Sequence, residues 1–224
     1  MNTTRLIIIG AGKSTIEIID IINEINSTKV EKIHIVGILD DNKKLKKKKL
    51  NGIPILGLIS DIKKFKREKF FLSIFSYKNR FLRSKIIKKI SKYKKKFISI
   101  IHPNTIMGKN AKIGHGCLIN NNCNIYSYSK IKSFCNISPN VSVASYSKIE
   151  ENCMIGNSSI ISSGAKVDKD CYIGLRNIVL ENIKIRSGCR TMPNTTINKD
   201  VIKKNSIVFG TPSKIIGYDN LLIK

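Results

Sequence analysis

Aliphatic side chains recur at every sixth position through the second half of the chain. From Ile113 to Ile185 each sixth residue is Ile or Val. A helix cannot keep one face apolar on a strict period of six, because six residues is not a whole number of 3.6-residue turns, and a long strand would alternate with period two. The pattern therefore predicts short strands that alternate with turns.

A second row of small residues repeats every 18 positions. It consists of Cys117, Cys135, Cys153, Cys171 and Cys189. Each of the first four lies two residues before an Ile of the first row, so both point to the same face of a strand. Three sixes make one turn of a triangular solenoid, and successive turns stack at about 4.8 Å. We interpret the cysteines as small core residues and predict no metal site, because C-x2-C pairs are absent.

The repeat often begins with an aliphatic residue and a glycine, as in Ile113-Gly114, Ile155-Gly156 and Ile173-Gly174. This pattern resembles the hexapeptide-repeat proteins, whose fold is a left-handed parallel β-helix. The resemblance covers roughly residues 102–213 and predicts a second domain over residues 101–213, with residues 214–224 as a C-terminal tail.

The first hundred residues carry a different pattern. An apolar strand over 5–10 leads into the glycine turn of Gly10 and Gly12, then a helix with Ile at 16, 19, 22 and 25, then a strand over 32–39 that ends at Asp40. This order predicts a small α/β, Rossmann-like domain over residues 1–100. It continues with apolar segments at 53–57 and 70–75 and a basic helix near 79–92. A P-loop is excluded, because its first glycine would fall on Ile7.

Charge adds little to the functional picture. The chain has 41 Lys+Arg against 15 Asp+Glu, a formal charge of +26. The lysines gather in residues 43–49 and 85–96, where Tyr93 is the only aromatic residue, too few for a nucleic-acid stacking platform. We therefore expect no nucleic-acid partner. No apolar run approaches the ~18 residues of a membrane span, so we expect a cytoplasmic protein.

Short motifs in both halves resemble one family, the sialic-acid O-acetyltransferase and bacillosamine N-acetyltransferase group of sugar acyltransferases. They are IIIGAGKS at 7–14, GILDDN at 37–42, NGIPILG at 51–57, NRFLR at 79–83, HPN at 102–104 and FGTPSK at 209–214. The resemblance implies acetyl-CoA as donor, an amino- or hydroxy-sugar as acceptor, often nucleotide-linked, and a homotrimer.

The same resemblance places nucleotide-sugar contacts on Gly10, Gly12, Asp40 and Asp41. Lys13 and the serine after it replace the family's Gly-His pair. An ammonium at residue 13 would attract a diphosphate as a point charge.

The family's catalytic base, a His followed by an acid, is missing. One alignment places it at Ser127 and the other at Ser145, one turn apart, and each serine is followed by Tyr. The flanking turns favour Ser127. His115 has the right local phase but lies 12 residues before Ser127, on a different side of the triangle. A serine hydroxyl is a poor base near neutral pH.

Three explanations of the missing base remain open. A carboxylate from a nearby turn could replace it, at Glu150, Glu151 or Asp168. An amine acceptor could arrive partly deprotonated, so that positioning alone supports transfer. Or the protein is a weak or inactive relative that acts as a nucleotide-sugar-binding or scaffold protein. We expect an acetyl-CoA-dependent sugar acyltransferase of surface-glycan biosynthesis, with the binding protein as the alternative.

Overall fold

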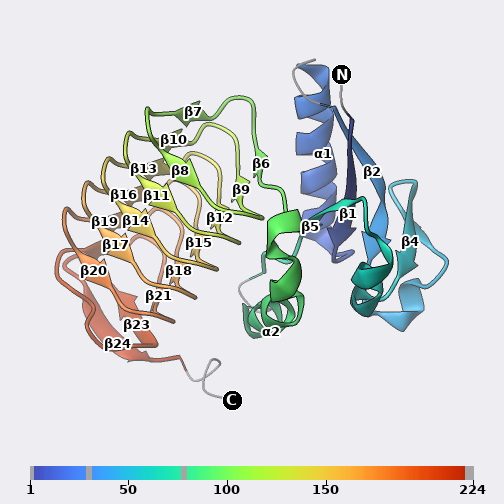
Figure 1. The fold of residues 1–224 in the computed structure, drawn as a ribbon. Helices are drawn as coiled ribbons and strands as arrows, with labels where there is room; N and C mark the ends of the chain where they lie inside the picture. The colour runs from blue at the N-terminus through green and yellow to red at the C-terminus, as the bar shows by residue number, and fades with distance from the viewer. Residues whose placement is uncertain (1–2, 29–31, 77–79, 220–224) are drawn as a thin grey trace. The chain divides into compact units, whose positions relative to one another are not determined.

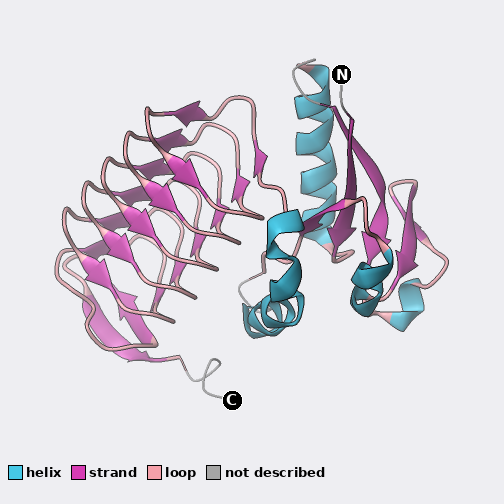
Figure 2. Ribbon diagram, in the orientation of Figure 1, coloured by secondary structure: helices cyan, strands magenta, loops and turns pink. Residues whose placement is uncertain are grey.

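The computed structural model describes residues 3–28, 32–76 and 80–219. The chain divides into two compact units, residues 1–103 and 104–224. Figures 1 and 2 show an α/β arrangement in the first unit and stacked short strands in the second. The expected fold class is confirmed.

The first unit is a mostly parallel sheet with the strand order β3-β4-β2-β1-β5. Its strands are β1 (Thr3–Ile9), β2 (Lys32–Leu39), β3 (Lys49–Leu50), β4 (Ile53–Gly57) and β5 (Lys69–Leu72). Strand β1 pairs in parallel with β2 and β5, β2 pairs in parallel with β4, and β3 is antiparallel to β4. The C-terminal half of β1, which lies between β2 and β5, is apolar because both of its faces are buried.

Two α-helices belong to this unit, α1 (Lys13–Ser27) and α2 (Arg80–Ile90). Helix α1 buries one side at a spacing of three and four residues, with Ile18, Ile22 and Ile25 in the core. Helix α2 and the 3-10 helix Ser91–Lys96 occupy the segment predicted as a basic helix. Residue 79 of that prediction lies outside the described residues. Two further 3-10 helices span Lys43–Leu45 and Ile59–Lys64, and β6 (Ile100–Ile101) comes after Ser91–Lys96.

Helix α2 buries two of its basic residues. The Arg80 side chain is 1% exposed and that of Arg83 is 0% exposed. The Arg83 guanidinium carbon lies 5.3 Å from the centroid of the Phe75 ring, within the range of a cation–π contact. The sequence predicted the basic helix but not the burial of these two cations, because burial depends on the tertiary fold.

The second unit is built mostly from two-residue strands that stack in parallel into three sheets. One sheet contains β7 (Ile106–Met107), β10 (Asn124–Ile125), β13 (Ser142–Val143), β16 (Ile160–Ile161), β19 (Ile178–Val179) and β22 (Thr196–Ile197). The next contains β8 (Lys112–Ile113), β11 (Lys130–Ile131), β14 (Lys148–Ile149), β17 (Lys166–Val167) and β20 (Lys184–Ile185). The third contains β9 (Leu118–Ile119), β12 (Asn136–Ile137), β15 (Met154–Ile155), β18 (Tyr172–Ile173), β21 (Arg190–Thr191) and β23 (Ser206–Phe209).

The register confirms the 18-residue turn. Ile131 pairs with Ile113 and Ile149, and Ile137 pairs with Ile119 and Ile155. These residues point inward, so in most strands the second position lies in the core and the first faces outward. The cysteine row is also internal: all five of its members are 0% exposed.

The corners between strands explain the many asparagines. Asn122, Asn140, Asn152, Asn182 and Asn194 all have φ between 54° and 61°. Asn tolerates this left-handed conformation better than most non-glycine residues, because its short polar side chain bonds locally. These asparagines therefore meet a backbone requirement of the corners.

The segment predicted as a C-terminal tail, residues 214–224, begins with a strand. Strand β24 (Lys214–Tyr218) is antiparallel to β23 and continues its sheet. An antiparallel strand that folds back here covers the exposed edge left by the last turn of the solenoid. Residues 220–224 lie outside the described residues.

Candidate functional site

The turn between β1 and α1 has a backbone that requires glycine. Gly10 has a φ of 102°, and a Cβ atom there would lie 3.0 Å from Ile74 Cγ1 and 3.1 Å from the Ser73 carbonyl oxygen. Gly12 is the N-cap of α1, and a Cβ on it would meet nothing within 4 Å. The open space and the N–H groups of the first helical turn, where Lys13 is exposed, are suited to an anionic group.

Both acidic residues after β2 are engaged by the protein itself. Asp40 accepts hydrogen bonds from the backbone N–H groups of Ala11 and Asn42, each at 2.7 Å. Asp41 accepts one from the N–H of Ile59 at 2.9 Å, and its other oxygen lies 3.8 Å from Lys89 Nζ. Asp40 therefore ties the glycine turn to the end of β2, and Gly10, Lys13 and Asp40 lie at the same edge of the sheet.

Sequence reasoning missed Ser73, which follows β5 and is 1% exposed. Its carbonyl oxygen accepts a hydrogen bond from Ser14 Oγ at 3.0 Å, and its hydroxyl lies 3.1 Å from Thr15 Oγ1. Thr15 stands where a dinucleotide fingerprint has its third glycine, and it donates to the Gly10 carbonyl oxygen at 2.7 Å. A lone serine directly after an apolar strand was the available signal, because ligands of such sheets bind at the carboxyl ends of the strands.

In the second unit, Ser127 and Ser145 lie on consecutive turns at one corner of the solenoid. The Ser127 carbonyl oxygen accepts a hydrogen bond from Tyr146 N–H at 3.3 Å, and that of Ser145 accepts one from Gly164 N–H at 3.1 Å. Both serines are half-buried. The two alignments of the family base therefore lead to the same corner, one turn apart.

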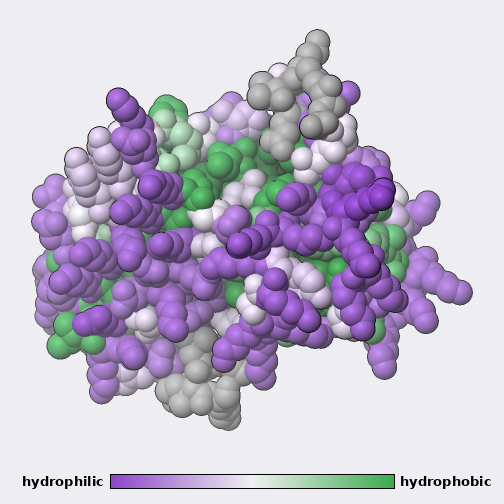
Figure 3. Space-filling view, viewed as in Figure 1, coloured by the Kyte–Doolittle hydropathy of each residue, from purple (hydrophilic) through white to green (hydrophobic). Residues whose placement is uncertain are grey.

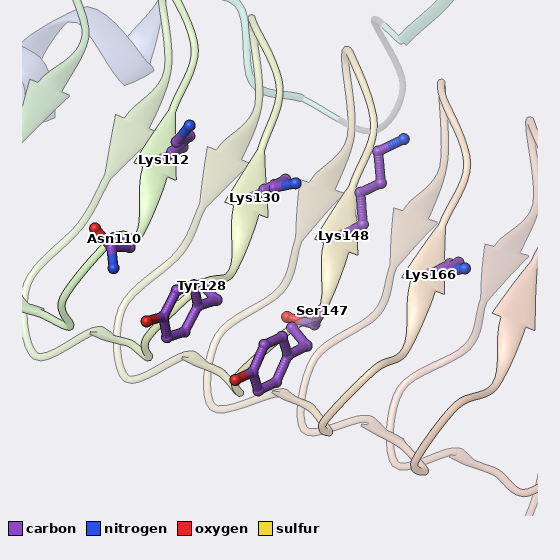
Figure 4. Close-up of a pocket in the computed structure, with 8 residues that line it drawn as sticks. Asn110, Lys112, Tyr128, Lys130, Ser147, Lys148 and Lys166 are labelled. Atoms are coloured by element: carbon purple, nitrogen blue, oxygen red, sulfur yellow. The ribbon is translucent and has the colours of Figure 1, made fainter.

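This corner carries a stacked pair of tyrosines. The rings of Tyr128 and Tyr146 are parallel, with centroids 5.2 Å apart, and the residues are 46% and 67% exposed. They border a groove of about 520 Å³ that is also lined by four lysines of one sheet (Figure 4): Lys112, Lys130, Lys148 and Lys166. The candidate serines thus lie next to an open groove with aromatic and cationic walls.

His115 lies at a different corner. Its carbonyl oxygen accepts a hydrogen bond from Phe134 N–H, in a column that continues through Ser133 and Glu151. Its side chain is exposed. Within one chain the structure does not bring His115 or Glu151 together with Ser127.

The other candidate carboxylates form ion pairs on the lysine-bearing sheet. Glu150 Oε1 lies 2.5 Å from Lys148 Nζ, and Asp168 Oδ2 lies 3.6 Å from an Arg186 nitrogen. The corner of the two serines continues through Ser163, and Glu181 follows Ser163 by one 18-residue turn and is exposed. Sequence reasoning missed Glu181 as a carboxylate of this corner, although its spacing from Ser127 is a multiple of 18.

The buried cysteines are not nucleophiles in this fold. Burial raises the pKa of the Cys153 thiol well above its ordinary value, and hydrogen bonding with Cys135 and Cys171 raises it further. Burial likewise raises the pKa of Cys189 to about 12. Neutral thiols in an apolar core have a structural role, since the thiolate is the reactive form. Within the described ranges, no three His, Cys, Asp or Glu side chains gather in a way that could hold a metal ion.

Comparison with known proteins gives a family match for the first unit. Residues 5–96 match the PglD N-terminal domain family. The matched range contains the whole sheet of the first unit, including Gly10 and Asp40. No curated protein matches the chain significantly.

Solved structures match both units in the same order. A variant of perosamine N-acetyltransferase from Caulobacter crescentus, in complex with CoA and GDP-perosamine, is 19% identical with a TM-score of 0.80, covering 95% of this chain and 96% of that one. The acetyltransferase domain of PglB from Neisseria gonorrhoeae, in complex with acetyl coenzyme A, is 18% identical with a TM-score of 0.80, covering 96% and 100%.

WeeI from Acinetobacter baumannii is 19% identical with a TM-score of 0.79, covering 96% of this chain and 100% of that one. The resemblance drawn from the sequence motifs is confirmed, and so is the hexapeptide-repeat fold. Among the described residues, no helix has the length and apolar character needed to cross a membrane.

Proposed function

We propose that this protein is an acetyl-CoA-dependent acetyltransferase that acts on an amino- or hydroxy-sugar carried by a nucleotide, in the synthesis of a surface glycan in the cytoplasm. The observation that carries the proposal is the shared two-unit architecture, which matches perosamine N-acetyltransferase over 95% of this chain. The first unit supplies the nucleotide-sugar contacts at Gly10, Gly12, Lys13, Asp40 and Asp41. The corner of Ser127 and Ser145 is the site of transfer.

The reaction needs an acceptor that loses a proton as it attacks the thioester carbonyl. Neither serine can take that proton efficiently at neutral pH, so the enzyme relies on positioning and on backbone N–H groups at the corner. Loss of a general base costs about 10²–10⁴ in rate. We therefore expect a slow enzyme with an amine acceptor. An amine that arrives partly deprotonated can attack the thioester in its neutral form, without a base on the protein that first removes a proton.

Ligand binding does not require a histidine in every such protein. The perosamine N-acetyltransferase variant, in which a histidine is replaced by asparagine, is described in complex with both CoA and GDP-perosamine. By analogy, the Ser-Tyr sequence at the corner of this chain is compatible with binding of both substrates.

We further propose a homotrimer. The outer face of the β7–β22 sheet exposes aliphatic side chains, with Ile106 68%, Ile160 42% and Ile178 37% exposed. Exposed aliphatic residues on the outer face of a sheet favour burial against a second copy. Light scattering at several concentrations tests this assembly, and Ile178→Glu should shift it toward monomer.

The decisive experiment restores the base. Acetyl-CoA binding is first measured by calorimetry at moderate and at high salt, because a strongly cationic protein attracts any anion at low salt. Release of the CoA thiol is then followed with nucleotide-linked amino-sugars for wild type, Ser127→His and Ser145→His. Ser163→His, at the next turn of the same corner, is the matched control.

We expect the histidine at the correct turn to raise kcat by about 10²–10⁴, with Ser163→His unchanged. Saturable acetyl-CoA binding with no acceleration in either variant would contradict transfer at this corner. Absence of acetyl-CoA binding at high salt, with retained nucleotide-sugar binding, would instead favour the scaffold role that the missing histidine suggests.

A further inference from the structure

One sheet of the solenoid carries a lysine at the first position of every strand. These residues, which we call the lysine ladder, are Lys112, Lys130, Lys148, Lys166 and Lys184. Lys130 pairs in register with Lys112 and Lys148, and Lys166 pairs with Lys148 and Lys184. The corresponding outward positions of the β7–β22 sheet carry no charge.

The ladder is a row of like charges held at the strand spacing of about 4.8 Å. Four of its five members are exposed, and Lys148 is half-buried. Within the part of the chain that the structure describes, Lys148 is the member of the ladder with an ion pair, to Glu150. Two ammonium groups at this spacing repel by about 1 kcal/mol in water, so the row is costly unless anions lie along it.

The positive charge forms a line rather than a broad patch. The residues that follow the ladder strands are balanced in charge, because Lys132 and Arg186 share that column with Glu150 and Asp168, and Asp168 forms an ion pair with Arg186. On the other side the stacked rings of Tyr128 and Tyr146 form a wall. Hydrophilic side chains cover most of the second unit in the view of Figure 3.

The groove of about 520 Å³ runs between the tyrosine wall and four members of the ladder (Figure 4). Its lining crosses consecutive strands β8, β11, β14 and β17, so it follows the solenoid axis. A linear ligand in this groove meets one ammonium per turn, and the tyrosine hydroxyls can donate hydrogen bonds to its oxygens.

We propose that the lysine ladder binds a linear phosphate chain of the polyphosphate type. A phosphoanhydride chain carries charge at every phosphorus with one bridging oxygen between neighbours, so several phosphates fit along the closely spaced ladder. In a nucleic-acid strand a sugar separates the phosphates, and its bases would need free aromatic faces. Here the two tyrosines cover one face of each other, which leaves one free face on each ring, fewer than an extended stacking platform offers. A phosphate chain in this groove lies beside the corner proposed for acetyl transfer, but it is held by the lysines and not by Ser127 or Ser145.

The test measures binding of orthophosphate, pyrophosphate, tripolyphosphate and long-chain polyphosphate to the full-length protein by calorimetry across a salt series. We expect affinity to rise with chain length. Lys130→Gln/Lys166→Gln should weaken binding of the long chain by about tenfold or more. It should also reduce the slope of log affinity against log salt by about 1.4, because each ammonium that neutralises a phosphate contributes about 0.7 to that slope.

The matched control is Lys46→Gln/Lys48→Gln, which removes the same charge from two exposed lysines of the first unit. We expect this variant to bind long-chain polyphosphate within about twofold of wild type. Equal weakening by both double variants would overturn the proposal, because it would show general charge attraction. Affinity independent of chain length, or tighter binding of a single-stranded oligonucleotide or of anionic vesicles, would overturn it as well. None of these results depends on acetyl transfer.

Discussion

Replacing Gly156 by alanine tests how closely the solenoid turns approach one another. A Cβ atom on Gly156 would lie 2.7 Å from the Gly174 carbonyl carbon and 2.8 Å from its oxygen. Ordinary contacts between carbon atoms begin near about 3.5 Å, so two turns that are hydrogen-bonded through Gly156 N–H and the Ile173 carbonyl oxygen must separate. Because both sides of the contact are backbone, no side-chain rotation relieves it.

The magnitude follows from two opposing effects. Overpacking of this kind costs about 1–3 kcal/mol. Replacing glycine by alanine restricts the unfolded chain and returns about 0.4–1 kcal/mol. We expect Gly156→Ala to reduce the free energy of unfolding by about 1–2 kcal/mol, which lowers Tm by about 2–8 °C for a chain of this length.

Gly217→Ala is the matched control in the same unit. There a Cβ atom would meet only Ile207 Cδ1 at 3.8 Å, an ordinary contact. Thermal and guanidinium unfolding followed by far-UV circular dichroism compares the two variants with wild type. The reasoning is refuted if Gly156→Ala is as stable as Gly217→Ala, since the turns would then separate without measurable cost.

Three further predictions concern the thiols, the lysine ladder and the glycine turn. The pKa of Cys189 is raised from its usual 9.0 to about 12 by burial, so the unfolded chain loses this proton first as pH rises. The contribution of Cys189 to the free energy of unfolding should therefore be fully present below pH 9 and be lost between pH 9 and about 12. Cys189→Ala should flatten that part of a stability–pH curve. Lys130→Gln should raise stability by up to about 1 kcal/mol at low ionic strength, and the gain should disappear in high salt because exposed charges are screened. Asp40→Ala removes the acceptor of the Ala11 N–H bond. It should lower the affinity for nucleotide-sugars in calorimetry, while acetyl-CoA binding stays unchanged; equal loss of both ligands would indicate general unfolding instead.

Much of the fold was determined by the sequence alone. The period of six and the cysteine row predicted the parallel solenoid, because every turn repeats the same backbone geometry and inner positions have no access to water. The apolar segment of β1, its glycine turn and Asp40 likewise predicted the first sheet, since these signals are local. The lysine ladder is also an 18-residue period, but it emerges only when charges are compared across turns rather than along runs of the chain.

Only the tertiary structure decided which distant residues meet. The 18-residue period already puts Ser127 and Ser145 at one corner, but only the structure shows the stacked tyrosine pair and the groove beside them. The two buried arginines of α2 carry no distinctive local pattern, because their environment is made by strands and helices far away in the chain. Periodicity determines which face of a strand a residue occupies, but the contacts of that face depend on packing between segments that the sequence does not place together.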